Sequence, residues 1–506
     1  MVFSMSAFDK YKLYRNKIRK YNLEKSLIGL WQYENHILNG SVLPAISWYY
    51  YKNGSKQDIQ AYVKPWQVET VLKELIINAS CTGSICIDSF MRIAFILDAV
   101  HDVSNEFDAE YLNESNIFYG VYKILNQQVP WQGGSRLRGM QRYFELFSAA
   151  NLDEIFHDKY GVTVSGAYLI GMFFYAMLQK SPYVDISFDF GTLSLDAAAA
   201  KTYVDSLIID IKNCQSQLRD CARYDGSWLY SPNCLRDYPF VRMNSGRILC
   251  PMPSLLLMRL TSGIYYDLVT DKRFSNAFGD AFEGYVGSVV DGYLKYDCEV
   301  LKETPYLFNN STRRGFDYCI KQNNVALLIE CKTLRPRFDT KSAPDNETAE
   351  KDFSKLSSAV FQSLKNLNDI ILGRTTWSVK DEVPHVLVVT LENWFADLPP
   401  VADIVHDQFL MAARKEGFDK DFVEKFRYSI CSIEEFEMLC GVAATSGLSE
   451  VLAKKLDGDN VKCNMHGFLI SNFSEALEAI DINSTFALWG VLEKRLAELT
   501  AGAVAR

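Results

Sequence analysis

The sequence contains no apolar run long enough to cross a bilayer and no cysteine–histidine spacing typical of a zinc site. Its longest apolar run, 164–178, suits a buried helix, and the opening residues, MVFSMSAFDKYK, lack the apolar segment of a signal peptide. Twelve cysteines occur without a CxxC pair, and there are only six histidines. This pattern disfavours structural zinc and favours free thiols in a reducing compartment. We therefore expect a cytoplasmic protein that does not enter a membrane.

Several common catalytic motifs are also absent. The chain has no GxxxxGK[ST] phosphate loop, no GxSxG nucleophile turn and no HExxH zinc helix. The commonest phosphate-loop, esterase and zinc-protease designs therefore lack the residues they need. The net charge of −9 means that the chain as a whole does not attract nucleic acid, so any such binding must use a local basic patch.

The composition provides enough apolar sequence for two or three globular domains, with 506 residues of which 48% are hydrophobic and 23% charged. Apolar residues at helical spacing predict that the first half is mainly helical. The expected helices are 7–25, 63–78, 88–99, 117–126, 137–149 and 195–221. Basic residues accompany the apolar stripe of the first helix; a solvated face is the simpler interpretation, and a phosphate-contacting segment is the alternative.

Proline and glycine become frequent between Tyr224 and Pro253, which predicts turns, a short hairpin and a domain boundary. A helix at 254–270 should follow. We expect an α+β or α/β protein in three parts: a mainly helical regulatory or recognition domain (1–250), a domain of mixed helices and strands (251–445), and a helical extension packed on it (446–506). The extension should contain a short strand at 467–470 and a closing helix at 484–501.

The stretch Arg314–Thr333 is the most informative part of the sequence. It is typical of two strands joined by a polar turn, and the second strand begins with the apolar run Val325–Ile329. Glu330 and Lys332 then share a face, because side chains alternate along a strand. A hairpin brings Asp317 opposite Glu330. Two carboxylates and a lysine beside a core strand are costly unless they are paired or bound to a cation.

This hairpin resembles the catalytic hairpin of the PD-(D/E)XK, or restriction-endonuclease-like, nucleases. Asp317 matches the first acid of the family motif, Glu330-Cys331-Lys332 matches its (D/E)-x-K, and Phe316 stands where the family often has proline. The expected order of a helix, three strands, a helix and a strand also matches the family core. Besides the two strands of the hairpin, these elements are a helix at 274–294, a strand at 296–304, a helix at 348–372 and a strand at 385–391. A further strand is expected at 428–434. The resemblance covers about residues 254–439.

The resemblance implies an αβββαβ core and a site for Mg²⁺, with Mn²⁺ as a substitute. It implies three catalytic residues: Asp317, Glu330 and Lys332. The implied metal ligands are Glu283, Asp317, Glu330 and the backbone carbonyl of Cys331. The alternative for Glu283 is an ordinary glutamate on the flank of a surface helix.

Four further residues are candidates for contact with substrate. Gln362 and Lys365 lie where members of the family often touch the scissile phosphate, although both are also ordinary helix-surface residues. Arg313 and Arg314 precede Asp317, where they can hold the nucleic-acid backbone or serve as solvated turn residues.

The resulting expectation is a Mg²⁺-dependent nuclease that cleaves DNA rather than RNA. From the family, defence against foreign DNA is the expected setting, with the helical half sensing a signal or recruiting a protein partner. A homo-oligomer is a usual way to cut both strands. Three alternatives stay open: a structural ion network, an inactive nuclease-like domain that binds nucleic acid or acts as a scaffold, and an RNA-cleaving enzyme.

Overall fold

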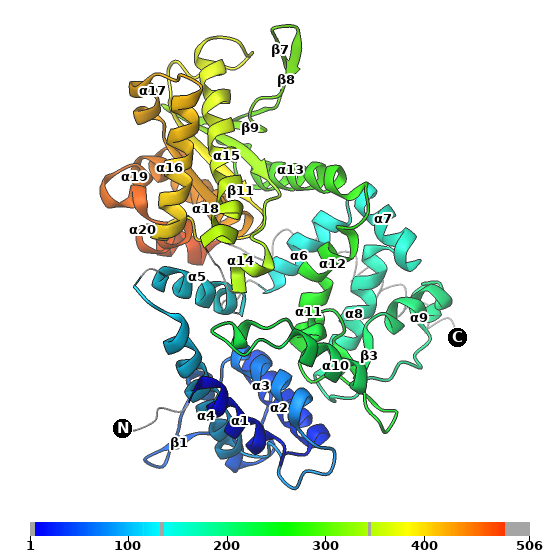
Figure 1. The fold of residues 1–506 in the computed structure, drawn as a ribbon. Helices are drawn as coiled ribbons and strands as arrows, with labels where there is room; N and C mark the ends of the chain where they lie inside the picture. Colours follow the sequence, from blue (N-terminus) through cyan, green and yellow to red (C-terminus); the bar gives the residue numbers. More distant parts are fainter. Residues whose placement is uncertain (1–5, 115, 132–135, 343–345, 481–506) are drawn as a thin grey trace. The chain divides into compact units, whose positions relative to one another are not determined.

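The computed structural model describes residues 6–114, 116–131, 136–342 and 346–480. These residues combine helices with small sheets, as in an α+β protein. The chain forms two compact units, which divide between Phe274 and Ser275 and can be followed by colour in Figure 1. The sequence placed a boundary near residue 250, so two helices that follow that point belong to the first unit.

The first unit is mainly helical. Its helices are α1 (Ala7–Ile18), α2 (Leu23–Asn39), α3 (Pro65–Asn78), α4 (Phe90–Tyr111), α5 (Ile117–Gln128), α6 (Arg136–Phe147), α7 (Ala150–Tyr160), α8 (Val164–Leu178), α9 (Ala197–Asp205), α10 (Ile211–Cys221), α11 (Pro253–Leu260) and α12 (Ser262–Leu268). Two small sheets accompany them, made of β1 (Tyr51–Lys52) with β2 (Ser55–Lys56), and of β3 (Ile208–Asp210), β4 (Phe240–Arg242) and β5 (Ile248–Leu249).

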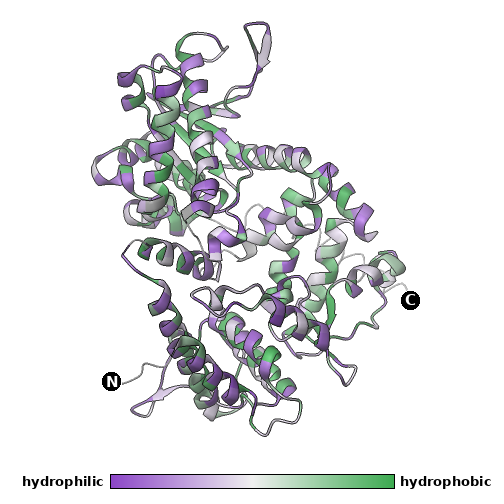
Figure 2. Ribbon diagram, viewed as in Figure 1, coloured by the Kyte–Doolittle hydropathy of each residue, from purple (hydrophilic) through white to green (hydrophobic). Residues whose placement is uncertain are grey.

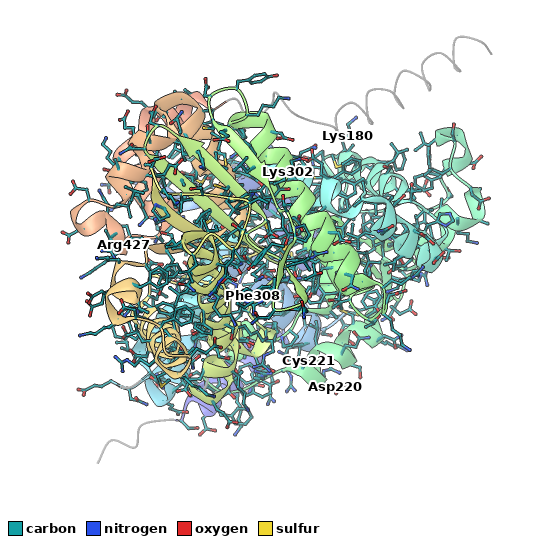
Figure 3. All side chains as sticks on the ribbon, turned by 90° about the horizontal axis from the view of Figure 1, so that it is seen from above. Lys180, Asp220, Cys221, Lys302, Phe308 and Arg427 are labelled. Atoms are coloured by element: carbon teal, nitrogen blue, oxygen red, sulfur yellow. The ribbon has the colours of Figure 1, made fainter. Side chains whose placement is uncertain are left out.

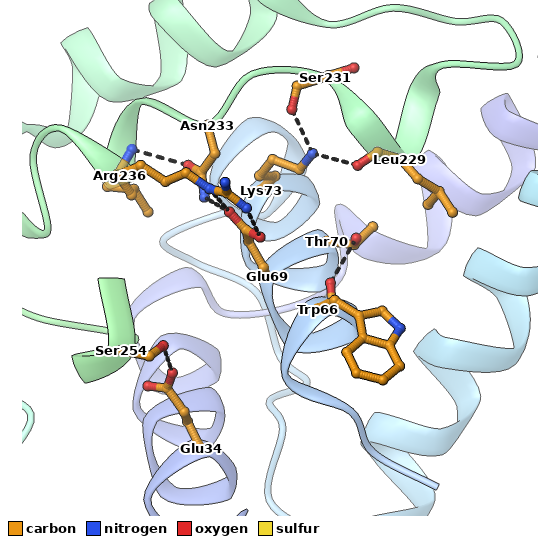
Figure 4. Close-up of polar contacts among 11 residues, drawn as sticks. Glu34, Trp66, Glu69, Thr70, Lys73, Leu229, Ser231, Asn233, Arg236 and Ser254 are labelled. Atoms are coloured by element: carbon orange, nitrogen blue, oxygen red, sulfur yellow. Dashed lines mark hydrogen bonds and ion pairs between the residues drawn. The ribbon is translucent and has the colours of Figure 1, made fainter. Parts of the chain in front are cut away.

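Buried charges on α3 fix the loop that follows α10. Glu69 accepts hydrogen bonds from Nε and Nη2 of Arg236, at 2.8 and 2.7 Å. One turn further along α3, Lys73 donates to the carbonyls of Leu229 and Ser231, at 3.0 and 2.9 Å (Figure 4). Because buried polar groups are costly only when they lack partners, these contacts hold the loop on α3 at small cost.

The predicted apolar stripe of the first helix is confirmed at Tyr11, Tyr14 and Ile18, which are buried, but not at Leu13, which is exposed. The helix itself is shorter than the predicted 7–25. It stops at Ile18, Tyr21 then forms an isolated bridge to another segment, and α2 begins after its N-cap, Asn22. Backbone pairing with the distant residues Ser80 and Ile85 therefore overrides the helical pattern of the sequence here.

Two other predicted helices are interrupted. The helix expected over 195–221 was wrong as a single element, because Ile208 and Ile209 pair with β4 and form strand β3 between α9 and α10. Consecutive β-branched residues favour such an extended segment. The helix expected over 254–270 is broken at Thr261, whose ψ of −103° separates α11 from α12.

The second unit is built around a five-stranded sheet in the order β12-β11-β10-β9-β6. Strands β6, β9 and β10 are antiparallel, whereas β10, β11 and β12 are parallel. A separate hairpin, β7–β8, is inserted between β6 and β9. The strands are β6 (Glu299–Lys302), β7 (Tyr306–Phe308), β8 (Ser311–Arg313), β9 (Tyr318–Gln322), β10 (Val325–Lys332), β11 (Val383–Thr390) and β12 (Tyr428–Ser432). The helices are α13 (Phe274–Tyr293), α14 (Phe338–Ser342), α15 (Asn346–Ile371), α16 (Pro399–Lys415), α17 (Lys420–Lys425), α18 (Ile433–Ser446), α19 (Leu448–Lys455) and α20 (Met465–Ala479).

The centre of this sheet is apolar on both faces. Val325–Ile329 in β10 and Val386–Val389 in β11 are entirely buried, and Figure 2 shows hydrophobic residues concentrated in these strands. Strands with continuous apolar runs are typical of sheets covered on both sides. The stripe of α15 is buried as predicted at Phe353 and Val360, but Ile371, expected in the same stripe, is 50% exposed at the end of the helix.

The tail of the second unit is helical in its described part. A strand was predicted at 467–470, and this prediction is wrong because those residues lie inside α20. That helix is initiated by Asn464, whose side chain accepts a hydrogen bond from the backbone N–H of Gly467 at 2.6 Å. The helix predicted at 484–501 lies outside the described residues.

Two predictions from composition can be compared with the structure. The twelve cysteines are free thiols, as expected. Within the described ranges, no single helix has the length and hydropathy to cross a membrane. The pairs α7–α8 and α18–α19 reach these values only when both helices are counted together, and each pair is sharply bent.

His385 gives the second unit a specific sensitivity to acid. It is buried in β11, its Nε2 lies 3.1 Å from the hydroxyl of Ser429, and burial lowers its pKa to about 3. The unfolded chain takes up this proton near pH 6.5, so stability contributed by neutral His385 is lost as the pH falls below that value. The loss is about 1.4 kcal/mol for each pH unit.

We predict that His385→Gln, which keeps an amide for Ser429, loses less stability than the wild type between pH 7 and pH 4.5. The measurement is thermal unfolding of both proteins across this range. Equal slopes for the two proteins would contradict the assignment, because every other titrating group is shared by them.

Candidate metal centre

Three carboxylates from separate elements converge at one edge of the sheet. Glu283 lies on α13, Glu303 directly follows β6, and Asp317 directly precedes β9. One oxygen of each lies within 4.8 Å of one oxygen of the other two, and all three side chains are partly buried. Carboxylates at this spacing repel one another, so the arrangement favours a cation held among them.

The antiparallel ladder places Glu303 beside Asp317. Lys302 pairs with Tyr318 in the last register of β6 and β9, and the backbone N–H of Glu303 continues this ladder by donating to the carbonyl of Asp317 at 2.9 Å. On its other side, the N–H of Asp317 donates to the carbonyl of Ile329 in β10 at 3.0 Å. The backbone of Asp317 is thus held by both neighbouring strands.

The side chain of Asp317 is fixed by the strand that carries the predicted motif. Its Oδ2 accepts a hydrogen bond from the backbone N–H of Cys331 at 2.6 Å, and it also accepts from the Cys331 thiol. These bonds orient the carboxylate toward β10. A carboxylate held in one orientation loses little further freedom when it binds a cation.

Glu283 is positioned by close packing of α13 against β9. The hydroxyl of Tyr318 donates to the backbone carbonyl of Glu283 at 3.0 Å. The same hydroxyl would lie only 2.3 Å from a Cβ at position 287, so the glycine found there is what allows the helix to approach. Farther along α13, the hydroxyl of Tyr285 donates to Glu437 of α18 at 2.9 Å, which fixes the rotation of the helix.

Glu330 and Lys332 form an ion pair next to this cluster. Nζ of Lys332 donates to Oε1 of Glu330 at 2.5 Å, and Asn366 of α15 donates to Oε2 at 3.3 Å. Gln362 in turn donates to Asn366 at 2.9 Å. Glu330 is only 5% exposed, so its two partners are what make its burial tolerable.

A pocket of about 540 Å³ opens onto the acid cluster. Its lining combines the first turns of α13 with the ends of β9 and β10, and consists of Ser275, Asn276, Gly279, Asp280, Phe282, Glu283, Arg314, Asp317, Cys331, Lys332 and Thr333. Cys331 and Lys332 thus both contribute to the lining. A phosphate that enters here meets both the acids and the two cationic side chains.

The electrostatics of the site follow from burial and from crowding of like charges. Burial, followed by repulsion from Asp317 and Glu303, raises the pKa of Glu283. Burial also raises the pKa of Asp317 against the opposing hydrogen bond from Cys331, and it raises the pKa of Glu330 to about 7 against the opposing charge of Lys332. These carboxylates are therefore costly to ionise, and a bound divalent cation would relieve that cost.

The pKa of Lys332 is also raised, but for a different reason. Burial alone would lower its pKa, but the charge of Glu330 and the hydrogen bond between them outweigh burial, and the pKa is raised. Asp317 adds to this effect. Lys332 is therefore an ammonium ion throughout the neutral range and serves as a fixed positive charge at the pocket.

The structure brings together some of the predicted site residues. Glu283, Asp317, Cys331, Lys332 and Arg314 line one pocket. Glu330 lies beneath it, bonded to Lys332, and is not one of the three acids whose oxygens meet. That Glu330 and the backbone carbonyl of Cys331 bind a metal ion stays a prediction.

Three other predicted residues lie away from the pocket lining. Arg313 pairs with Asp369 at 3.3 Å, and Lys365 pairs with Glu416 at 3.8 Å. Gln362 is linked to the site only through Asn366 and Glu330. Contact of these three residues with substrate also stays a prediction.

Glu303 was missed by the sequence analysis. Its signal was present, because a strand was expected over 296–304 and Glu303 lies at its end. Counting the register back from the hairpin would have placed it opposite Asp317. The inserted β7–β8 hairpin separates the two residues along the chain and hides this relationship.

Comparisons of this chain with protein-family models, with curated proteins and with solved structures found no match. The assignment of the site therefore depends on its geometry and on the chemistry of its residues.

We predict opposite effects of Glu303→Gln with and without metal. Without a divalent cation the variant should melt at a higher temperature than the wild type, because one of three mutually repelling carboxylates is gone. Added Mn²⁺ should stabilise the variant less than it stabilises the wild type. If the variant binds Mn²⁺ tenfold more weakly, this difference in stabilisation is about 1.4 kcal/mol at saturating Mn²⁺. Thermal unfolding with and without Mn²⁺ measures both effects.

The matched control is Glu299→Gln, which removes an exposed glutamate from the same strand outside the cluster. It should leave both melting temperatures close to those of the wild type. An Mn²⁺ effect that is equal in the two variants would rule out Glu303 as a ligand.

Proposed function

We propose that this protein is a metal-dependent nuclease that hydrolyses phosphodiester bonds in DNA. The observation that carries the proposal is the meeting of Glu283, Glu303 and Asp317 within 4.8 Å, beside a pocket that Glu283 and Asp317 line together with Lys332. Hard carboxylate oxygens suit Mg²⁺ or Mn²⁺, and a positive side chain beside them suits an anionic substrate.

The fold of the second unit supports the same proposal. Its sheet has antiparallel β6, β9 and β10 followed by parallel β11 and β12, with α13 before the sheet and α15 between β10 and β11. This is the arrangement expected of the PD-(D/E)XK core, and Asp317, Glu330 and Lys332 occupy the matching positions. We therefore propose membership of that superfamily for residues 275–480.

The roles of the residues follow from their positions. A divalent cation held at the site would polarise the phosphate and lower the pKa of a water molecule. Asp317, Glu303 and Glu283 bind and orient that cation. Lys332, held as an ammonium by Glu330, stabilises the negative charge that grows on the phosphate rather than accepting a proton.

In this proposal the first unit senses a signal or recruits a partner, because the second unit contains the groups that the reaction needs. Defence against foreign DNA is a setting that suits such an arrangement. The enzyme is kept from uncontrolled cleavage of its own genome if its activity depends on the first unit. A domain that only binds nucleic acid is a competing possibility, since Glu330 and Lys332 also satisfy each other as an ion pair.

The proposal predicts cleavage of DNA that requires Mg²⁺ or Mn²⁺. Asp317→Asn should remove the activity, and Lys332→Met should lower kcat by a factor of about 10² to 10³, because a preorganised charge is lost. Lys415→Met, which removes an exposed lysine from α16, is the matched control and should act like the wild type. Digestion of circular and linear DNA and of RNA, with metal or EDTA, measures these effects.

Cleavage by Asp317→Asn, or cleavage in EDTA, would refute the proposed site. Binding of DNA with no cleavage under any metal would identify a binding module instead. Cleavage of RNA alone would make the protein a ribonuclease with the same metal chemistry.

A further inference from the structure

The hairpin inserted between β6 and β9 lies between two of the candidate metal ligands. The chain leaves β6 at Lys302, places Glu303, runs out through β7 and β8, and returns to place Asp317. Figure 1 shows the hairpin extending beyond the sheet, and Figure 3 labels Phe308 within it and Lys302 at the end of the strand that leads into it. We refer to residues 304–314 as the β7–β8 arm.

The outer part of the arm has a defined shape. Phe308 pairs with Ser311, which leaves a two-residue turn of Asn309 and Asn310. Both have positive φ, 48° and 61°, a geometry that asparagine tolerates and that matches the twist of a two-stranded hairpin. The arm is therefore a short, twisted ribbon rather than a loose loop.

The base of the arm is anchored to α15. Asp369, which is buried, accepts hydrogen bonds from the hydroxyl of Tyr306 at 2.6 Å, from Arg374 at 2.6 Å and from Arg313 at 3.3 Å. The guanidinium groups of Arg313 and Arg374 also lie over the ring of Phe308, at 4.2 and 4.4 Å from its centroid. The direction in which the arm extends is thus fixed by contacts at its base.

The surface of the arm is unusual for a protein with a net charge of −9. Residues 304–314 include no acidic residue, and the exposed side chains include two asparagines, two threonines, a serine and two arginines, which pair with Asp369 and Glu303 at its base. Leu307 adds a large apolar side chain that is 77% exposed. Amide, hydroxyl and guanidinium groups are the usual donors to phosphate oxygens, and an exposed leucine is a typical wedge in a groove.

We propose that the β7–β8 arm enters a groove of duplex DNA beside the phosphate to be cleaved, with its polar donors on the backbone and Leu307 against the bases. A two-stranded ribbon is narrow enough for the major groove. The inference rests on the proposed function, because the arm begins and ends at the acids that would bind the metal. Its exposed hydrogen-bond donors and its lack of acidic side chains suit phosphate oxygens, which selects nucleic acid over a second protein as the occupant.

The test is the binding of a labelled DNA duplex to the full-length chain carrying Asp317→Asn, in Mg²⁺, so that binding is separated from cleavage. Thr312→Glu should weaken binding by about tenfold, and Thr312→Arg should tighten it and steepen the salt dependence by about 0.9 in the slope of log K against log salt. Leu307→Ser should weaken binding by about three- to tenfold with an unchanged salt slope. Fluorescence anisotropy over a series of salt concentrations measures these values.

Two matched controls lie on other surfaces of the same unit. Ser471→Glu on α20 is the control for Thr312→Glu, because it adds the same charge elsewhere. Val461→Ser is the control for Leu307→Ser, because it removes an apolar side chain that is 47% exposed outside the arm. Both controls should bind DNA like the parent protein. Because Thr312 and Leu307 are exposed, their variants should also keep the parent melting temperature, and the gain expected from Thr312→Arg is not produced by a folding defect.

The failure of the arm inference can be told apart from the failure of the proposed function. Hydrolysis of bis(p-nitrophenyl) phosphate with Mn²⁺ reports on the metal centre alone, and arm variants in the wild-type background should hydrolyse it at the parent rate. If this reaction and DNA binding persist while the arm variants behave like their controls, the arm inference is wrong. If the variants change binding of duplex RNA but not of DNA, the assigned occupant is wrong. If the wild type does not hydrolyse the ester and the Asp317→Asn protein does not bind DNA, both proposals fail.

Discussion

The candidate site of the second unit depends on strand pairing and helix packing that bring three mutually repelling carboxylates together. Glu303 and Asp317 sit side by side because β6 and β9 are antiparallel and in register, and ladder hydrogen bonds hold the backbones of both residues in place. Helix α13 brings Glu283 close to β9 because Gly287 has no side chain that would collide with the hydroxyl of Tyr318. Like charges held in this way raise one another's pKa, which burial raises further. The fold therefore maintains an unfavourable arrangement whose natural relief is a divalent cation.

The ion pair of Glu330 with Lys332 differs from the neighbouring acid cluster, although both lie at the same end of the sheet. Glu330 is fully satisfied, since Lys332 and Asn366 occupy its two oxygens. The three clustered acids form no such close pair among the described residues: Arg314 lies 4.0 Å from Glu303, and the charge of Lys332 acts on Asp317 at longer range. The pair consequently keeps Lys332 charged, and the cluster keeps its negative charge for a ligand. A single strand end thus supplies a fixed cation and an anionic site without letting them neutralise each other.

The sequence predicted the parts of this unit that depend on local pattern. The apolar run of β10 and the alternation after it placed Glu330 and Lys332 on one face, and the hairpin brought Asp317 to the same strand end. It did not predict Glu303, because the pairing of β6 with β9 spans an insertion that no local period reveals. Long-range pairing also defeated the prediction at Ile208 and Ile209, where partners in β4 convert the middle of a helical pattern into a strand. The strand predicted near Gly467 failed for the opposite reason, since the cap at Asn464 starts a helix that a short apolar run does not announce.

The insertion that hid Glu303 also explains how an exposed element can coexist with a fixed site. An arm that begins at one carboxylate of the cluster and ends at another would transmit its motion to both if it were free at its base. Asp369 of α15 prevents this, because it accepts hydrogen bonds from Tyr306 and Arg313 of the arm, while hydrogen bonds from Tyr306 and Arg374 hold its pKa low despite burial. Charged hydrogen bonds of this kind are individually strong, and losing one partner leaves a buried charge uncompensated. Asp369 thus holds the base of the arm, and Arg313 and Arg374 hold Phe308 beside its turn, so the arm and the two carboxylates at its ends are positioned together.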